Sequence, residues 1–383
     1  MRKLACLTFL LWTIGVFAQS PLNLKADGSA YTKIAQEVGA YPIVCLGEET
    51  HWVESYLEVK FELIKHLHEE QDFNVLIFES GFINAFMSNW YGLKHLEGLQ
   101  ESLYDIWQTT TTLRLYQYQF KQEDNGTPIS FWGCDIKGPV SFRFSRFLKE
   151  LFHSHLPTYA EELSKVDSSF VEIRDAWEPA IGGVYRGVYL SSEKADSIKS
   201  IYRAALDSLK THRGILFPDN KNTTTSNYRF IERCLQNRLY LLQLMQLPTY
   251  QQKHQFRDSI MAENTNWLME AWRHKDQKYL LWGADIHLSK NAKWEANGNA
   301  WKNNRSLVEH LQTKTSKPIF SIGIKPRKRL DKESRKSMGI KPTGVYWLSQ
   351  NTLPEELSMP FGDEHDALII CGKTRTLDKI RKK

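Results

Sequence analysis

Six short apolar runs recur along the chain, and this pattern limits the possible folds more than any other feature. Each run is four to six residues long, is rich in branched side chains, and does not alternate between polar and apolar residues. Strands of this kind are buried on both faces, as in a parallel sheet covered by helices. The runs are Tyr41 to Leu46, Asn74 to Phe78, Ile129 to Gly133, Tyr279 to Trp282, Pro318 to Ile322 and Ala367 to Cys371.

The segment between the first two runs has the periodicity of a helix. Tyr56, Val59, Leu63, Ile64 and Leu67 recur at i, i+3, i+7, i+8 and i+11, which places them on one apolar face. Strand, helix and strand within about forty residues form a βαβ unit. We therefore predict an α/β protein with a mainly parallel sheet flanked by helices.

A large segment after the third run has the pattern of helices alone. Helices are predicted over Phe142 to Phe152, Ser192 to Thr211, Asn227 to Gln246 and Tyr250 to His274. Ser191 or Ser192 is suited to cap the second of them, and Gly182-Gly183 and Pro218-Asp219-Asn220 are breakers between helices. We predict an α/β core formed by residues 19–139 and 276–383, with residues 140–275 as an inserted, all-helical subdomain.

The first residues have the features of a secretory signal. Arg2 and Lys3 precede an apolar stretch from Leu4 to Phe17, and Val16-Phe17-Ala18 offers a cleavage site. Residues 1–18 are therefore predicted to be removed on export, to the periplasm or the medium. No later stretch approaches ~18 uninterrupted apolar residues, so we expect no transmembrane segment and a soluble mature protein.

Charge and cysteine usage exclude two classes of protein. Loss of residues 1–18 removes two positive charges, so the net charge falls from +6 to +4, a mild excess that does not indicate nucleic-acid binding. Four cysteines remain, and Cys45, Cys134 and Cys371 lie within apolar runs. We expect buried free thiols, with no disulfide framework.

Ionisable residues follow four successive predicted strands. In open α/β sheets, ligands bind beyond the carboxyl ends of the strands, so these side chains should meet at one edge. In chain order they are Glu48 and His51, then Glu79, then Asp135, then Asp285 and His287. This arrangement predicts a functional site.

Each of these residues also has a structural interpretation. Glu48 could accept backbone N–H groups at a helix start, Asp135 could form a turn, and His51 or His287 could cap a helix. Glu79 ends a wholly apolar strand, so its pKa should be raised unless it meets a cation. An acid–base role and an ion pair with an arginine are both compatible with that position.

Absent motifs narrow the chemistry. The sequence has no Gly-x-Ser-x-Gly, which removes support for an α/β-hydrolase serine nucleophile. It also lacks Gly-x-Gly-x-x-Gly, the P-loop motif and His-Glu-x-x-His. Histidine with carboxylates remains, a set suited to general-base activation of water or to a divalent metal held by Glu and His.

Six short motifs together resemble the erythromycin esterase family in order and spacing. They are LGEETH (Leu46 to His51), LIKHLHEEQDF (Leu63 to Phe73), LIFESG (Leu76 to Gly81), FWGCD (Phe131 to Asp135), RDSIMAEN (Arg257 to Asn264) and WGADIHLSK (Trp282 to Lys290). The resemblance covers most of the mature chain. It implies metal-independent hydrolysis of a carboxylic or lactone ester, with a histidine activating water at the sheet edge.

The resemblance also implies roles for individual residues. His51 matches the general base of the family, and Glu48 matches the acid of its Gly-Glu-x-x-His loop. Glu79 matches the carboxylate that ends the second strand, and Arg257 with Asp258 matches an Arg-Asp pair that opens a helix. Arg257 could then face a developing oxyanion or a substrate carboxylate, or pair with Glu79 or Glu48.

Two positions depart from the family pattern. The His-Asn-x-His tetrad is Ala284-Asp285-Ile286-His287 here, so its first histidine is missing. Trp52 replaces the glycine that often follows the loop histidine, which would place a large group at the mouth of the site. Asp285 could polarise His287 or favour a metal.

The leading hypothesis is a hydrolase for a small-molecule ester or lactone. His51 would take a proton from water, Glu48 or Glu79 would orient it, and His287 and Arg257 would stabilise the oxyanion. Trp52, Asp135, Asp258 and Asp285 would bind substrate or support the site. No cofactor is expected.

Two alternatives stay open. One is a metal-dependent hydrolase with Glu48, His51, Glu79 and His287 as ligands of a divalent metal. The other is a non-catalytic periplasmic protein that binds haem or another ligand, which the missing histidine at Ala284 favours.

Overall fold

The computed structural model describes residues 21–24, 29–177, 190–217, 224–271, 277–292, 295–296, 299–300, 304–349 and 363–372. The strands are β1 (Leu22–Asn23), β2 (Ile43–Glu48), β3 (Phe73–Gly81), β4 (Ser130–Asp135), β5 (Lys278–Ala284), β6 (Glu295–Ala296), β7 (Asn299–Ala300), β8 (Ile319–Pro326), β9 (Val345–Ser349) and β10 (Ala367–Cys371). The helices are α1 (Ser29–Val38), α2 (Glu54–Gln71), α3 (Phe82–Trp90), α4 (His95–Ser102), α5 (Thr110–Asp124), α6 (Arg143–His153), α7 (Pro157–Trp177), α8 (Ser192–Thr211), α9 (Arg213–Leu216), α10 (Thr224–Gln246), α11 (Tyr250–Ala271), α12 (Asp285–Leu288), α13 (Leu307–Gln312) and α14 (Lys332–Ser337). Two 3-10 turns, Asp105–Trp107 and Arg327–Arg329, complete the assigned elements.

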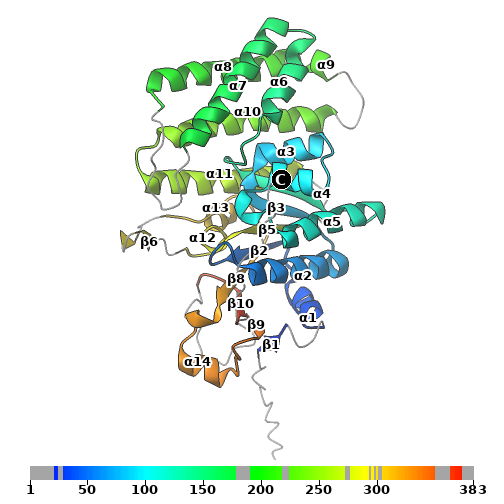
Figure 1. Cartoon of the computed structure of the whole chain (residues 1–383), viewed down its shortest axis with the longest axis vertical. Coiled ribbons are helices and arrows are strands. Elements are labelled where there is room, and N and C mark those ends of the chain that lie inside the picture. The colour runs from blue at the N-terminus through cyan, green and yellow to red at the C-terminus, as the bar shows by residue number, and fades with distance from the viewer. Residues whose placement is uncertain are drawn as a thin grey trace, which may run out of the picture.

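The main sheet has the strand order β1-β9-β10-β8-β2-β5-β3-β4. The six predicted strands are all present and pair in parallel as β10-β8-β2-β5-β3-β4. β9 runs antiparallel to β10 and to β1. In Figure 1 the strands follow one another down the molecule, from β3 near the stacked helices to β1 and β9 at the far end. The predicted α/β class with a mainly parallel sheet is confirmed.

Both faces of the sheet are buried, as the apolar runs require. Along β2, Ile43 and Cys45 belong to one hydrophobic cluster, whereas Val44 and Leu46 belong to another. Helices α1, α2 and α5 supply the second cluster, and α3, α11 and α13 contribute to the first. Because successive side chains of a strand point to opposite faces, unbroken apolar runs produce this three-layer arrangement.

Between β4 and β5, the described residues form helices α6 to α11. Figure 1 shows α6 to α10 stacked beyond α3 at one end of the molecule, with α11 between them and the sheet. α8 has the predicted bounds, and the side chain of Ser191 caps it by accepting a hydrogen bond from the Lys194 backbone N–H. α6, α10 and α11 also lie at their predicted places, and α7 is additional. These helices share one hydrophobic cluster with a face of the sheet. The inserted segment therefore packs directly onto the core.

Three further sets of predictions concern the cysteines, transmembrane segments, and the signal and breaker segments. Cys45, Cys134, Cys234 and Cys371 are buried free thiols, as predicted. Within the described ranges, no helix has the length and apolarity to cross a membrane. The predicted signal sequence, Gly182-Gly183 and Pro218-Asp219-Asn220 lie outside the described residues.

A row of three glycines crosses the sheet near the carboxyl ends of β2, β5 and β8. Gly47 is in register with Gly283 on one side and with Gly323 on the other. A Cβ at Gly283 would lie 3.0 Å from Glu79 Oε2, and one at Gly47 would lie 3.0 Å from Asp285 Oδ1. The absence of side chains in this row leaves room for ionisable groups to lie across the sheet.

Candidate active site

The carboxyl ends of the parallel strands bring the predicted residues to one edge of the sheet. Glu48 ends β2, Asp135 ends β4, and α12, which carries His287, directly follows β5. Glu79 lies in β3, whose pairing with β4 is irregular between Phe78 and Gly81. Such irregularities re-aim side chains and are frequent beside active sites.

His51 and Glu48 form the first cluster of the site. His51 Nδ1 lies 2.7 Å from Glu48 Oε1, and the Trp107 indole N–H donates to the same oxygen at 2.8 Å. The other oxygen, Oε2, accepts a hydrogen bond from Lys60 Nζ at 2.7 Å. The buried carboxylate is therefore satisfied at both oxygens and fixes the orientation of the His51 ring.

Lys60 balances the charge of Glu48 inside the protein. Burial raises the pKa of Glu48, but Lys60 and His51 outweigh burial and hold this pKa below its usual range. The ammonium of Lys60 also donates to Gly283 O at 3.2 Å and lies 4.6 Å from the ring centre of Trp282. Since a buried charge needs a partner, Glu48 and Lys60 depend on each other.

His51 lines a cleft of about 800 Å³ together with Glu79, Arg257, Tyr104 and Lys137. Its side chain is 29 % exposed, and its Nε2 has no hydrogen-bond partner among the described residues. With Nδ1 held by Glu48, Nε2 is the nitrogen that can meet a ligand.

Trp52, expected at the mouth of the site, is not among the residues that line this cleft. Its backbone φ is 71°, in the left-handed region that non-glycine residues rarely adopt. The preference for glycine after the loop histidine thus has a backbone origin at this position.

Arg257 of α11 forms the second cluster by joining two carboxylates from neighbouring strands. Its Nε donates to Asp135 Oδ2 at 2.9 Å, and its Nη2 donates to Glu79 Oε1 at 2.8 Å. Burial raises the pKa of both carboxyls, but the neighbouring cations reverse this shift and lower it. Glu79 therefore has the cationic partner that its apolar strand requires, and it is ionised.

His287 lies beneath this cluster with both ring nitrogens engaged. Nδ1 lies 2.9 Å from Asp258 Oδ2, and Nε2 lies 3.2 Å from Glu79 Oε1. Burial lowers the pKa of His287, but Asp258 and Glu79 outweigh it and raise the pKa to about 10. Nε2 is also 3.2 Å from Arg257 Nη1. A protonated ring can only donate, so we assign the Nε2 hydrogen bond to Glu79.

Asp285 does not polarise His287, contrary to one expectation. Its carboxylate lies 2.7 Å from Lys325 Nζ and 2.7 Å from His365 Nε2. Residues two positions apart on a helical turn do not face each other, so Asp285 and His287 point to different neighbours. Asp258, from α11, is the partner of His287.

Several residues near the cleft were missed by the sequence interpretation. Lys60 had a detectable signal, because it lies at i+4 from Tyr56 and i−4 from Ile64, inside the apolar stripe of α2. Tyr104, whose hydroxyl donates to Asp135 at 2.8 Å, and Trp107 had none. They come from the 3-10 turn Asp105–Trp107 and the residue before it, far from any predicted strand.

The four metal ligands of the alternative hypothesis do not gather into one site. Glu48 and Glu79 are each paired with a cation, Lys60 and Arg257 respectively. Among the described residues, the His, Cys, Asp and Glu side chains that form a group of three with ligand atoms within 4.8 Å of one another are Asp285, Glu364 and His365. Glu48, His51, Glu79 and His287 do not form such a group among the described residues, and the metal-dependent alternative stays a prediction.

The chain matches a known protein family over most of its length. The erythromycin esterase family matches residues 68–373. The chain belongs to the erythromycin esterase family. The matched segment begins after the loop that carries His51 and includes Glu79, Arg257 and His287. The chain also shares 26 % identity over 317 residues with YbfO of Bacillus subtilis (strain 168), a protein named as a candidate hydrolase. This match covers 78 % of the chain and 68 % of YbfO.

Solved structures share the fold. A Bacillus cereus protein superposes with a TM-score of 0.74 at 16 % identity, covering 94 % of this chain and 97 % of that one. A histidine-to-asparagine variant of the erythromycin esterase EreC, in its open conformation, gives a TM-score of 0.67 at 15 % identity and covers 94 % and 98 % of the two chains. A succinoglycan biosynthesis protein gives 0.70 at 14 % identity and covers 94 % and 95 %. At these identities the likeness concerns the fold.

Proposed function

We propose that this chain hydrolyses a carboxylic or lactone ester of a small molecule, with His51 as the general base. The observation that carries the proposal is the pairing of His51 Nδ1 with buried Glu48, while Nε2 is left for the cleft. A neutral imidazole fixed through one nitrogen can take a proton through the other. Membership of the erythromycin esterase family supports the reaction class.

The proposed reaction begins with a water molecule that His51 Nε2 deprotonates. The resulting hydroxide adds to the ester carbonyl carbon, and the carbonyl electron pair moves to oxygen. When the tetrahedral intermediate collapses, the bond to the alkoxide breaks, and His51 returns its proton to the leaving oxygen. The products are a carboxylic acid and an alcohol, which stay joined when a lactone is opened.

Arg257 is the group we assign to the developing oxyanion. It lines the cleft and keeps its positive charge beside Glu79 and Asp135. Preorganised cations of this kind stabilise charge without reorganisation during the reaction. His287 does not line the cleft, and we propose that it acts by positioning Glu79 and, through Glu79, Arg257.

A matched pair of variants tests the role of His51. His51→Ala should lower kcat on responsive ester or lactone substrates by roughly 100-fold or more, the usual contribution of a general base. His66 is the control, because its Nδ1 makes the same 2.7 Å contact with Glu70 on an exposed helix face. His66→Ala should retain full turnover, and equal activity in the two variants would contradict the mechanism.

Two further expectations stay predictions. Haem binding is tested by titration, where a Soret band that requires His51 would favour the ligand-binding alternative. Export is tested by the mass of the mature protein, which should begin at Gln19 if residues 1–18 are removed.

A further inference from the structure

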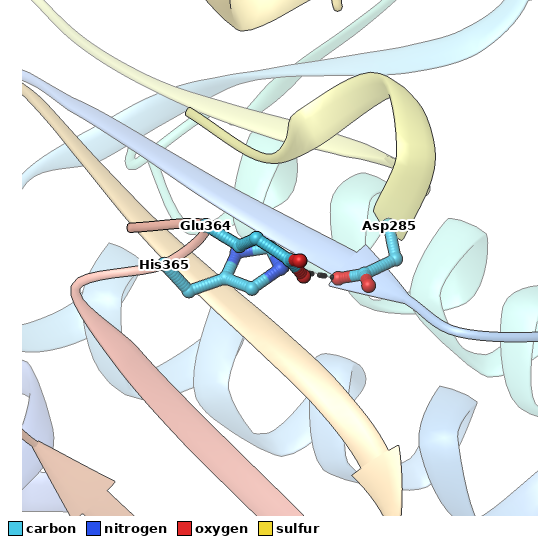
Figure 2. Close-up of side chains that lie close together, drawn as sticks. All are labelled: Asp285, Glu364 and His365. Atoms are coloured by element: carbon cyan, nitrogen blue, oxygen red, sulfur yellow. Dashed lines mark ion pairs between the residues drawn. The ribbon is translucent and has the colours of Figure 1, made fainter. Parts of the chain in front are cut away.

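Asp285, Glu364 and His365 converge beside the proposed active site but do not line its cleft. Asp285 is the first residue of α12, whereas Glu364 and His365 lie just before β10, which pairs with β8. Figure 2 shows the carboxylate groups of Asp285 and Glu364 turned toward the His365 ring. One ligand atom from each side chain lies within 4.8 Å of the other two.

The hydrogen bonds of His365 determine which ring nitrogen carries a proton. Ser321 Oγ donates its only hydrogen to Leu288 O at 2.6 Å. It must therefore accept from His365 Nδ1, which lies 2.8 Å away. A neutral His365 then presents a lone pair at Nε2, and this atom is 2.7 Å from Asp285 Oδ1. Two electron-rich atoms this close require a positive group between them.

The geometry favours a metal ion over a shared proton. Neither His365 Nε2 nor Asp285 Oδ1 has a partner with hydrogen-bond geometry, although the two atoms lie at ion-pair distance. A proton needs a nearly straight N–H···O arrangement, whereas a tetrahedral ion holds its ligands at a bent angle. With metal–ligand bonds of about 2.0 Å, the two atoms would separate to roughly 3.3 Å, a small adjustment.

Charge and support around the cluster agree with this interpretation. Lys325 Nζ holds the other oxygen of Asp285 at 2.7 Å, which leaves Oδ1 for a second cation. The carboxylates of Asp285 and Glu364, together with the Lys325 ammonium, carry one net negative charge, which favours a bound cation. His365 is 1 % exposed and its ring packs over Gly323, where a Cβ would lie 2.8 Å from Nε2. A metal-bound histidine usually donates its other ring N–H to a fixed acceptor, as His365 Nδ1 does to Ser321 Oγ.

We propose that Asp285 Oδ1, a Glu364 carboxylate oxygen and His365 Nε2 bind a divalent transition-metal ion of the Zn²⁺ type. One imidazole with two carboxylates suits zinc better than magnesium or calcium, which prefer oxygen ligands alone. Three protein ligands leave a fourth tetrahedral position for water. The ion ties the start of α12 to the segment before β10, so it braces the turn that carries His287. This site is independent of the ester-hydrolysis proposal.

Zinc binding to the full mature chain tests the site. Isothermal titration of metal-free protein with Zn²⁺ should give one tight equivalent and raise Tm by several degrees. Glu364→Gln removes a partly exposed ligand and should weaken that equivalent by roughly 100-fold or more. Glu70→Gln removes the carboxylate of the exposed His66–Glu70 pair and should leave it unchanged.

Cobalt supplies a second readout that does not depend on activity. Co²⁺ bound by one nitrogen and oxygens should give visible ligand-field bands that His365→Gln abolishes. Zinc binding of equal strength in the wild type and Glu364→Gln, or no tight equivalent in the wild type, would overturn the proposal. The latter result would assign the bridging position to a proton on His365.

Discussion

Lys60 Nζ lies 2.7 Å from Glu48 Oε2, and both side chains are almost completely buried. The pair joins the middle of α2 to the end of β2, directly behind His51. Because the two charges cancel, the carboxylate orients His51 without holding a full uncompensated charge beside it. The orientation of the proposed base therefore depends on a lysine that does not line the cleft.

Lys60→Met should destabilise the fold and reduce turnover. It leaves Glu48 buried without its cation, and loss of one partner of a buried ion pair costs about 3–5 kcal/mol. Urea unfolding and kcat measure the two effects. Lys65→Met is the control, because its ion pair with Glu62 is partly exposed and an exposed pair contributes up to about 1 kcal/mol. Equal losses in the two variants would disprove this role.

Arg257→Met should destabilise the fold as well as reduce turnover. It leaves Glu79 and Asp135 buried without their shared cation, and loss of one partner of a buried ion pair costs about 3–5 kcal/mol. Arg114→Met is the comparison, because this arginine is 53 % exposed in its pair with Glu62. An exposed pair contributes up to about 1 kcal/mol. Urea unfolding should separate the two variants, and equal losses would contradict the assignment.

The free energy of unfolding should decrease as pH rises from about 6.5 to about 10. His287 has a folded pKa of about 10, raised from 6.5, so its contribution is complete below the lower value and disappears as pH passes the upper one. The expected loss is on the order of a few kcal/mol. Denaturant titrations across this window should show the slope in the wild type and a flatter curve in His287→Gln. A wild-type curve as flat as the variant's would refute it.

Gly283→Ala should displace Glu79 and lower both stability and turnover. The new Cβ would lie 3.0 Å from Glu79 Cβ and Oε2, closer than side-chain atoms normally pack. Overpacking of this kind costs typically about 1–3 kcal/mol. Gly214→Ala is the control, since a Cβ there meets no atom within 4 Å and lies in a helix. It should be neutral or stabilise by up to about 1 kcal/mol. Thermal unfolding with kcat measures both effects.

Local pattern was sufficient to predict the strands of this sheet. The doubly buried runs give β2, β3, β4, β5, β8 and β10 directly, because burial on both faces selects apolar residues at every position. β9 is also wholly buried, but its antiparallel direction depends on how the chain returns to the sheet edge, which composition does not encode. α7 begins at Pro157, a residue suited to the first helical turn, and that signal was available.

The sequence identified most residues of the candidate site but not which of them pair with each other. The strand-end rule located Glu48, Glu79 and Asp135, since parallel strands present their carboxyl ends at one edge. The partner of His287 depends on how α11 packs across the sheet, so Asp258 could not be distinguished from Asp285 by position. The overlooked indication for Lys60 was its position within the apolar stripe of α2, which predicts a buried charge.

The shared hydrophobic cluster of the inserted helices and the sheet has a consequence for modularity. Arg257 and Asp258 reach the sheet edge from α11, the last helix of the insertion, and α11 packs against β4 and α13. A chain trimmed to its α/β portion would lose the guanidinium that joins two strands and would expose the apolar face beneath it. The helices and the sheet therefore form one folding unit, and the α/β portion alone does not contain the complete candidate site.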